Sequence, residues 1–386
     1  MSERALADYR DEFEVVRRKA YLISASLGPV GTRSRTYLDD YMAAWATKGA
    51  PDHVWFEDIF PTMGRLKDGF AALAGCAPSE VALTTNISIA LATILSCLDV
   101  RGDRRGIVLS ELDFPSDTNA IHAWASKHGF DVRTLRSPDG MTLPVEAFDD
   151  AIDERTAFVL VNRVLYRSSA LLDAAAVCRI ARDRGALSFV DDYHGIGVVP
   201  LDLHALGCDI YAAGALKFMC GGPGCVFLYA RADVLPRLSP TLTGWFATAA
   251  PFDFATGLPT YHPDARRLEH GTPPAPVFPI ALGGLEVIAE VGVQRIRERQ
   301  WALQDRVIAL ADELGLAVRT PRIPTARGGV VNVQVGPDAE RICHELLARD
   351  VCTDHRGDGL RISPHFFTME EDVDRLFAEL RPILGR

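Results

Sequence analysis

One stretch near the middle of the chain, residues 187–231, constrains the fold more than any other. An apolar run at 186–190 is typical of a buried parallel strand, and Asp191 and Asp192 follow it directly. A turn rich in glycine at 221–224 then leads into a second apolar run, 225–230. Ligands of open α/β sheets bind outside the carboxyl ends of the strands. The stretch therefore predicts an α/β fold with a ligand site at Asp191.

Two further side chains in this stretch add chemistry to the predicted site. His194 follows Asp191 closely, and Lys217 lies between two apolar residues, Leu216 and Phe218. Lost hydration disfavours the charged form of such a lysine and leaves a nucleophilic amine, which forms a Schiff base with an aldehyde. A carboxylate at a strand end can keep a pyridinium nitrogen protonated, as pyridoxal phosphate (PLP) requires. Taken singly, these residues read as a cap, a loop histidine and a surface lysine; their order and spacing favour a cofactor site.

The same residues resemble the cofactor segment of the class V aminotransferase group of fold-type I PLP enzymes. The resemblance is strongest to kynureninase, and weaker to cysteine desulfurases and isopenicillin N epimerases. It implies that PLP is the cofactor, that Asp191 pairs with the pyridine nitrogen, that His194 approaches the ring or its hydroxyl, and that Lys217 binds PLP covalently. Asp192 has no role in this pattern and is expected to cap a helix or loop.

Apolar runs at 81–85, 107–110, 132–135 and 158–164 alternate with helical patterns, which is the rhythm of βαβ units. Together with the resemblance, this predicts the α/β fold of fold-type I PLP enzymes: a mostly parallel, seven-stranded type of sheet flanked by helices, with a smaller α+β C-terminal domain. We expect an N-terminal arm (1–30), a large PLP-binding domain (31–277), and a linker helix with the small domain (278–386). The linker is predicted as one helical stretch from Phe278 to about Gly315.

The helix expected after the strand at 81–85 is a candidate phosphate site. Its first turn offers unpaired backbone N–H groups and the positive end of the helix dipole, beside the side chains of Thr85 and Asn86. The alternative is an ordinary N-cap. The resemblance to the phosphate-binding helix start of the family favours phosphate contacts from both residues.

An aromatic residue at the end of the 107–110 strand is placed to stack on a flat cofactor. The motif FPSD, Phe114 to Asp117, resembles the kynureninase signature, in which the phenylalanine stacks on the ring; desulfurases carry a histidine there. The resemblance makes Phe114 and Asp117 cofactor-binding candidates. Otherwise Phe114 is a core residue and Asp117 a helix cap.

Two later segments resemble parts of the family that reach a neighbouring subunit. TLTGWF, with Trp245, resembles a Gly-Trp segment that contacts the phosphate of the other subunit, and an indole N–H is a suitable donor. HGTPPAP, with Thr272, resembles the loop that completes the site across the dimer. They imply a homodimer with a shared active site; the alternative is a crossover loop with a buried tryptophan.

Two arginines are candidates for binding an anionic substrate. Arg361 lies in an Arg-x-Ser-Pro pattern that resembles the family's substrate-carboxylate site, and a guanidinium fork fits a carboxylate bidentately. A surface arginine is the alternative. Arg167, in the segment LYRSSALLD, is the second candidate: it either binds an anionic group of the substrate or is an ordinary solvent-exposed arginine, and the sequence favours neither.

Charge and cysteine spacing narrow the class of protein. A net charge of −10 with no basic block argues against nucleic-acid binding. The eight cysteines form no CxxC pair and no zinc pattern, so no metal site is expected. The N-terminus lacks a signal-peptide pattern, and the longest apolar run, 87–98, is too short to span a membrane. We expect a cytoplasmic protein with no membrane partner.

The expected reaction starts with loss of the Cα proton of an amino acid, with Lys217 as base, followed by cleavage at the β-carbon. A kynureninase-like C–C hydrolase and a β-lyase both fit. Leu216 stands where kynureninases have a tyrosine, which argues against authentic kynureninase. Cysteine desulfurase needs a mobile cysteine, and Cys352 lies in an apparent strand. An epimerase or an aminotransferase remains open, as does a non-catalytic PLP-binding regulatory protein, and the substrate is not readable.

Overall fold

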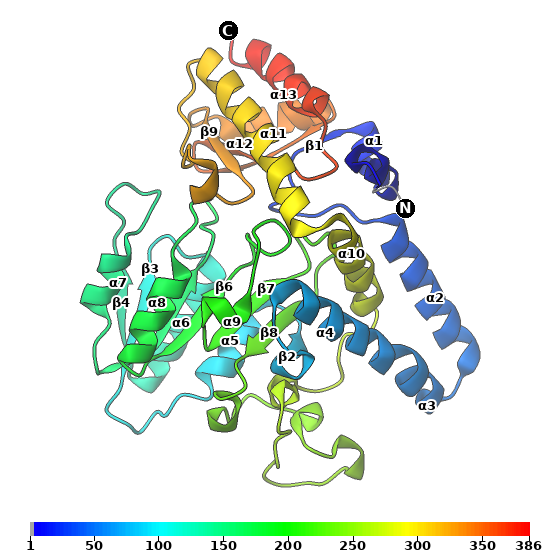
Figure 1. The fold of residues 1–386 in the computed structure, drawn as a ribbon, viewed down its shortest axis with the longest axis vertical. Helices are drawn as coiled ribbons and strands as arrows, with labels where there is room; N and C mark the ends of the chain where they lie inside the picture. The colour runs from blue at the N-terminus through cyan, green and yellow to red at the C-terminus, as the bar shows by residue number, and fades with distance from the viewer. Residues whose placement is uncertain (1–3) are drawn as a thin grey trace.

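The computed structural model describes residues 4–386 and contains a central seven-stranded sheet (Figure 1). The strand order is β2-β8-β7-β6-β5-β3-β4, and only β8 runs antiparallel to its neighbours. The predicted α/β fold with a mostly parallel sheet is confirmed. The strands are β2 (Val81–Thr84), β3 (Gly106–Ser110), β4 (Asp131–Leu135), β5 (Thr156–Asn162), β6 (Leu187–Asp191), β7 (Ile210–Gly214) and β8 (Val226–Ala230).

The central strands are apolar throughout because helices cover both faces of the sheet. Ile107 and Leu109 of β3 enter one core, and Val108 enters the other. This alternation is the two-residue period of a pleated strand. The connecting helices are α5 (Ile87–Leu95), α6 (Pro115–His128), α7 (Val145–Ala151), α8 (Ala174–Asp183) and α9 (Leu203–Leu206).

A helical layer packs beside β2 and β8. Helix α10 (Val277–Val291) packs against α2 (Thr32–Lys48) and α4 (Phe60–Ala74), and the three lie together in Figure 1. Helix α4 continues directly from α3 (Pro51–Val54) through a π-helical turn, η2 (Trp55–Ile59). The short 3₁₀ helices are η3 (Pro78–Glu80), η4 (Leu235–Arg237), η5 (Trp245–Ala247), η6 (Pro251–Asp253), η7 (Ala265–Leu268) and η8 (Pro324–Ala326).

The C-terminal part of the chain builds a second, antiparallel sheet of order β11-β12-β9. Its core includes Ala20 and Leu22 from the N-terminal segment, because β1 pairs with β10. The predicted domain limits stay predictions, and residues 1–3 of the predicted arm lie outside the described residues. The elements are η1 (Leu6–Glu12), α1 (Glu14–Arg18), β1 (Ala20–Tyr21), β9 (Val331–Gln334), α12 (Ala339–Ala348), β10 (Val351–Cys352), β11 (Asp354–Arg356), β12 (Gly359–Ile362) and α13 (Glu370–Ile383).

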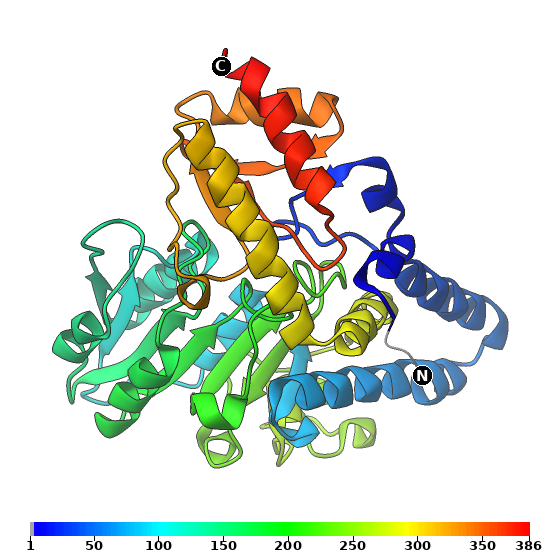
Figure 2. The same ribbon diagram turned by 45° about the horizontal axis from the view of Figure 1, so that its top comes forward.

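The prediction of one continuous helix from Phe278 to about Gly315 is wrong. The structure has two helices, α10 and α11 (Val293–Glu313), which meet at an angle of 80°. Gly292 stands between them with φ 85°, a conformation that glycine adopts without steric cost. Helix α11 then runs alongside α13, as Figure 2 shows.

Within residues 4–386, no single helix is long and apolar enough to cross a membrane. Helices α10 and α11 meet that criterion only as a bent pair. Most of the apolar side chains of α10 are buried inside the protein. The cytoplasmic location expected from the sequence stays a prediction.

Candidate active site

The candidate site lies where neighbouring parallel strands end at one edge of the sheet. Asn162 ends β5 and faces Asp191, the last residue of β6, across the ladder. Phe114 follows β3 and Lys217 follows β7 on the flanking strands. The fold therefore gathers residues that are distant in the sequence at the edge where ligands of such sheets bind.

Lys217 lies at the centre of this group. Its Nζ is 2.8 Å from Nε2 of His194, 5.3 Å from the ring centre of Phe114 and 5.5 Å from that of Tyr193. Burial lowers the pKa of Lys217 to about 7, although the charge of Asp191 opposes the shift. A substantial share of the amine is therefore neutral, and nucleophilic, near pH 7.

His194 is buried beside Lys217, and burial lowers the pKa of the imidazole well below its usual value. The nearby charge of Lys217 acts in the same direction. The imidazole is therefore neutral at pH 7. The structure places the imidazole beside Lys217, while its predicted approach to the cofactor ring stays a prediction. Tyr193, which no motif in the sequence had identified, also lies near Lys217.

Two buried carboxyl groups, those of Asp117 and Asp191, lie at this edge of the sheet. Asp191 accepts a hydrogen bond from the backbone N–H of Tyr193 (2.8 Å), and Asp117 accepts one from Nδ2 of Asn162 (3.3 Å). Burial raises the pKa of both groups, and that of Asp117 well above its usual value because Asp191 adds like charge. Asp117 therefore holds a proton more readily than Asp191, because hydrogen bonds and the charge of Lys217 oppose the effect of burial on the pKa of Asp191.

A third buried carboxyl group, that of Asp113, lies near Asp117 and Asp191. It accepts a hydrogen bond from the Ser110 backbone N–H (2.7 Å), and burial raises its pKa to about 7. Among the described residues, Asp117 Oδ1 and Asp113 Oδ1 are buried with no hydrogen-bond partner. An aromatic ring, an amine and buried acids fit a flat aldehyde cofactor that carries a basic ring nitrogen, as PLP does.

Asp192 is not a cap, contrary to the sequence expectation. Its Oδ2 lies 2.6 Å from Nη1 of Arg163 and accepts a hydrogen bond from the Tyr211 hydroxyl (2.9 Å). Both side chains are buried, so Asp192 compensates the charge of Arg163.

The predicted phosphate-binding residues lie at the start of α5. Asn86 caps that helix, since its Oδ1 accepts a hydrogen bond from the Ile89 backbone N–H (3.0 Å). Thr85 and Thr272 line the same small cavity, of about 60 Å³, although they are far apart in the sequence. The structure thus brings the helix start and the HGTPPAP loop together.

Trp245 lies apart from these residues, in a cluster of aromatic side chains. Its ring stacks on Phe254 at 5.8 Å and also contacts Phe246 and Phe252. Within residues 4–386, its ring contacts include none of the other candidate site residues. One chain alone does not bring Trp245 to the Lys217 site.

Arg361 is buried rather than on the surface. Its Nε donates to Oδ1 of Asp354 (2.9 Å), its Nη1 to the Tyr166 carbonyl (2.8 Å), and its Nη2 to the Ser26 hydroxyl (2.6 Å). Asp354 Oδ2 accepts a second hydrogen bond from Nη2, and one Nη1–H has no partner among the described residues. Asp354 and Ser26 hold the guanidinium in place, and no motif in the sequence had identified either residue as its partner.

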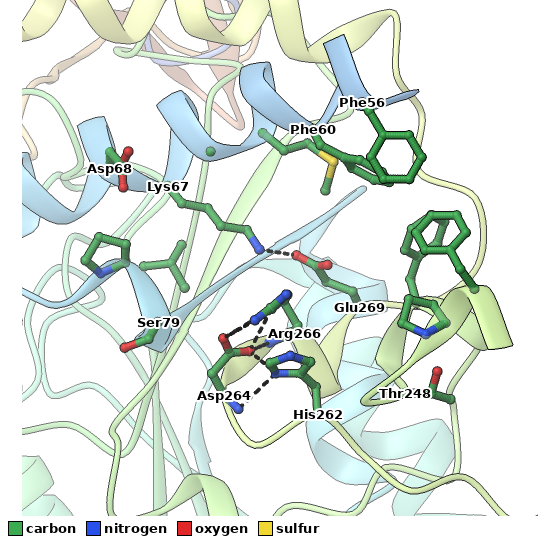
Figure 3. Close-up of a pocket in the computed structure, with 17 residues that line it drawn as sticks. Phe56, Phe60, Lys67, Asp68, Ser79, Thr248, His262, Asp264, Arg266 and Glu269 are labelled. Carbon is green, nitrogen blue, oxygen red and sulfur yellow. Dashed lines mark hydrogen bonds and ion pairs between the residues drawn. The ribbon is translucent and has the colours of Figure 1, made fainter. Parts of the chain in front are cut away.

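A separate groove of about 560 Å³ contains none of the candidate residues (Figure 3). Phe56 and Phe60 lie at one end, and Lys67 forms an ion pair with Glu269 (2.7 Å) at its centre. The groove shares Met63, Phe246 and Glu269 with the small cavity at the start of α5, but none of the residues around Lys217 lines it.

The chain is similar in sequence to a known family, and its fold is similar to that of a solved PLP enzyme. Residues 32–376 match the sequence profile of the family described as Aminotransferase class-V. The chain is 30% identical to the "Uncharacterized aminotransferase YcbU" of Bacillus subtilis over 96% of both chains. It is 30% identical to a kynureninase of Geobacillus thermodenitrificans, over 99% of this chain and 92% of that one. A solved structure of a C-DES mutant, with glycine covalently linked to its PLP cofactor, has a TM-score of 0.86 at 20% identity and covers 96% of this chain and 98% of its own.

Proposed function

The chain belongs to the aminotransferase class-V family. From that membership we propose that it is a PLP-dependent enzyme, which removes the Cα proton of an amino acid and then cleaves a bond at the β-carbon. The observation that carries the proposal is the position of Lys217. Its amine is buried, lies 2.8 Å from a neutral His194, and stands between the rings of Phe114 and Tyr193. This is the environment that makes a lysine nucleophilic.

Bound PLP would supply an electron sink for charge that develops at Cα of the substrate. Lys217 Nζ would bind its aldehyde carbon, and Phe114 would pack on the ring. Asp191 would hold the proton on the ring nitrogen, because its carboxylate is buried and its neighbour Asp117 protonates more readily than it does. Once substrate displaces the lysine, Lys217 Nζ would accept the Cα proton, since an amine with a pKa of about 7 is a suitable base at neutral pH.

Cleavage at the β-carbon is favoured over a desulfurase reaction by the cysteines. Cys352 lies buried in β10, which pairs with β1, and burial raises the pKa of its thiol. All eight cysteines are buried or half-buried. A desulfurase needs an accessible thiolate, whereas a C–C hydrolase or a β-lyase does not. The FPSD motif and the kynureninase relative point to the same class.

The first experiment incubates the PLP-loaded protein with L-kynurenine and 3-hydroxykynurenine and identifies products by mass spectrometry. An anthranilate with alanine would establish C–C hydrolysis. A panel of L-cystine and other amino acids then separates β-elimination, which gives pyruvate, from epimerisation and transamination. Lys217→Ala is the control, and turnover by that variant would contradict the mechanism. A PLP-loaded protein that changes none of these amino acids would support the regulatory alternative.

Leu216 offers a second, independent test of the kynureninase-like reading. Its side chain is half-buried immediately before Lys217, where a tyrosine hydroxyl would add a proton donor. If the substrate is kynurenine-like, Leu216→Tyr should accelerate hydrolysis. An unchanged rate would rule out Leu216 as the reason for an altered specificity.

We also propose that two copies of the chain associate. Phe56 and Phe254 are 54% and 71% exposed and lie with Phe252 at the groove of Figure 3 and the neighbouring loop. Exposed aromatic clusters of this kind are typical of interfaces. A second copy that covers this face would bury Trp245 and bring it toward the partner's site. Sedimentation equilibrium tests this: Phe254→Asp should shift the mass toward that of one chain and weaken PLP binding.

A further inference from the structure

A cavity of about 410 Å³ opens between the second sheet and the loops of the large sheet. It is distinct from the groove of Figure 3. The large sheet contributes the segment after β3, the loop after β4 and the segment around Ser168. The other wall comes from Arg319, from strands β9 and β11, and from the β11–β12 turn. The lining residues are Glu111, Leu112, Gly140, Met141, Arg167, Ser168, Arg319, Asn332, Gln334, Arg356, Gly357 and Asp358.

The alternation of the second sheet explains why this wall is polar. Arg361 on β12 stands opposite Asn332 on β9 and Asp354 on β11, so the three side chains share one face. Arg356 and Gln334 lie two residues further along their strands and point to the same side. The opposite face is apolar and packs on α11, α12 and α13. The polar face of the second sheet therefore faces the large domain and makes hydrogen bonds with it.

Three arginines bring positive charge to the cavity: Arg167, Arg319 and Arg356. Arg167 donates only to the Tyr166 hydroxyl (2.7 Å), and Arg319 only to the Asp139 carbonyl (2.8 Å), among side-chain hydrogen bonds in residues 4–386. Neither forms an ion pair in that part of the chain. Arg356 lies 3.4 Å from Asp354, whose carboxylate is already bound by Arg361. The cavity therefore holds guanidinium groups that lack a carboxylate of their own.

Two carboxylates also line the cavity, and they do not cancel this charge. The carboxylate of Glu111 is already paired, since its oxygens accept hydrogen bonds from the Arg136 guanidinium and from the Ser137 backbone N–H (2.8 Å). Asp358 is exposed at the β11–β12 turn. Arg356 is only 37% exposed, and its pKa is lowered by burial and by the charges of Arg361 and Arg167. An anion that entered the cavity would relieve this repulsion.

The cavity adjoins the Lys217 site through Tyr166. The Tyr166 ring contacts the Phe114 ring edge-on at 5.2 Å, and its carbonyl accepts from Arg361 (2.8 Å). Arg167, the next residue, lines the cavity, and its carbonyl accepts from Asn332 Nδ2 (3.0 Å). A substrate whose α-carboxylate is held at Arg361 could extend its side chain into the cavity.

We propose that this cavity binds a negatively charged group at the end of the substrate's side chain, so that the enzyme acts on an amino acid with two acidic groups. Arg167 and Arg319 bind the distal group, and Arg356 completes its positive surroundings. The geometry of a guanidinium suits a carboxylate, and charged hydrogen bonds of this kind are the strong ones. The inference deepens the proposed function and rests on it.

The test is a binding titration of the PLP-loaded wild-type enzyme, followed by the absorbance of the cofactor. The ligands are L-aspartate, L-glutamate and L-2-aminoadipate, each compared with an amide or neutral analogue of the same length. At least one acid should bind about tenfold more tightly than its neutral analogue, which is the scale of one charged hydrogen bond. L-cysteate and O-phospho-L-serine distinguish a sulfonate or phosphate from a carboxylate.

Substitution of the cavity arginines tests whether they cause the preference for acidic ligands. Arg167→Gln with Arg319→Gln should abolish the preference for the acid and leave the affinity for the neutral analogue unchanged. Arg306→Gln removes an exposed arginine that is paired with Asp374 elsewhere, and should retain the preference. Equal affinities for acids and neutral analogues in the wild-type enzyme would overturn the inference but not the proposed function. Absence of any spectral response to any amino acid would overturn the proposed function itself.

Discussion

The carboxylate of Asp354 binds the guanidinium of Arg361 through two nitrogens, with Nε and Oδ1 2.9 Å apart. Arg361 is 1% exposed, and Asp354 lies opposite it in the β11–β12 ladder. The arginine predicted to bind the substrate carboxylate is therefore compensated before any substrate arrives. One Nη1–H of Arg361 remains for the substrate, because the Ser26 hydroxyl accepts from Arg361 Nη2 and donates to Asp354 Oδ2.

Loss of this compensation should destabilise the protein. Asp354→Asn leaves a buried guanidinium without its counter-charge, which should lower the free energy of unfolding by roughly 3 kcal/mol. Urea denaturation measures the change. Asp374→Asn is the matched control, because its pair with Arg306 is 43% exposed on both sides and should contribute less than about 1 kcal/mol. Equal losses in the two variants would contradict a special role for the Asp354–Arg361 pair.

Asp117 and Asp191 should respond differently to the same substitution. We expect Asp117 to hold a proton, because burial and the charge of Asp191 raise its pKa well above the usual value. Asp117→Asn then replaces a neutral group by a neutral group of the same shape and should change turnover little. Asp191→Asn removes the charge that holds the ring-nitrogen proton, and should reduce turnover by about 10² or more, as when a group aimed at developing charge is lost. Steady-state rates on one substrate compare the two. A larger loss for Asp117→Asn would show that the proton assignment is reversed.

The rate at which PLP binds covalently should follow the titration of Lys217. The lowered pKa of about 7 means that the neutral, nucleophilic amine forms as the pH rises through that value. An ordinary lysine reaches this form only near pH 10.4. Absorbance of the apoprotein mixed with PLP at pH 5.5 to 9 should show a rate that rises and levels off near neutrality. A rate that still climbs steadily up to pH 9, without levelling off, would mean that burial does not lower the pKa of Lys217.

The sequence predicted the parts of the site that local pattern controls. Asp191 ends an apolar strand, His194 follows it, and Lys217 precedes a glycine turn, so their order alone indicates the chemistry. Fold class followed from the alternation of apolar runs and helices. Strand β7 was not assigned, because its short IYAAG run has no strong strand pattern.

The residues that sequence reasoning missed are long-range partners. Ser26 reaches Arg361 across 335 positions, and Arg163 reaches Asp192 from the end of a different strand. No local signal identifies such pairs, since strand pairing in the large sheet brings Arg163 to Asp192 and the folding of the N-terminal segment onto the second sheet brings Ser26 to Arg361. The alternation of Asp354 and Arg356 on one strand face was the single local sign of a polar wall.

Gly28 provides a test of how the N-terminal segment supports the lysine. Its N–H donates to the Leu216 carbonyl (2.8 Å), and a Cβ at this position would lie 2.0 Å from the Lys217 carbonyl and 2.9 Å from the Cys220 Cα. Because both contacts are backbone, Gly28→Ala must displace the lysine loop, at a cost of about 1–3 kcal/mol. PLP affinity should fall in parallel with stability. Gly31→Ala is the control, since its Cβ would make only ordinary contacts, with the Phe13 ring at 3.4 Å and the Glu12 carbonyl at 3.6 Å. Similar PLP affinities in both variants would show that Gly28 does not position Lys217.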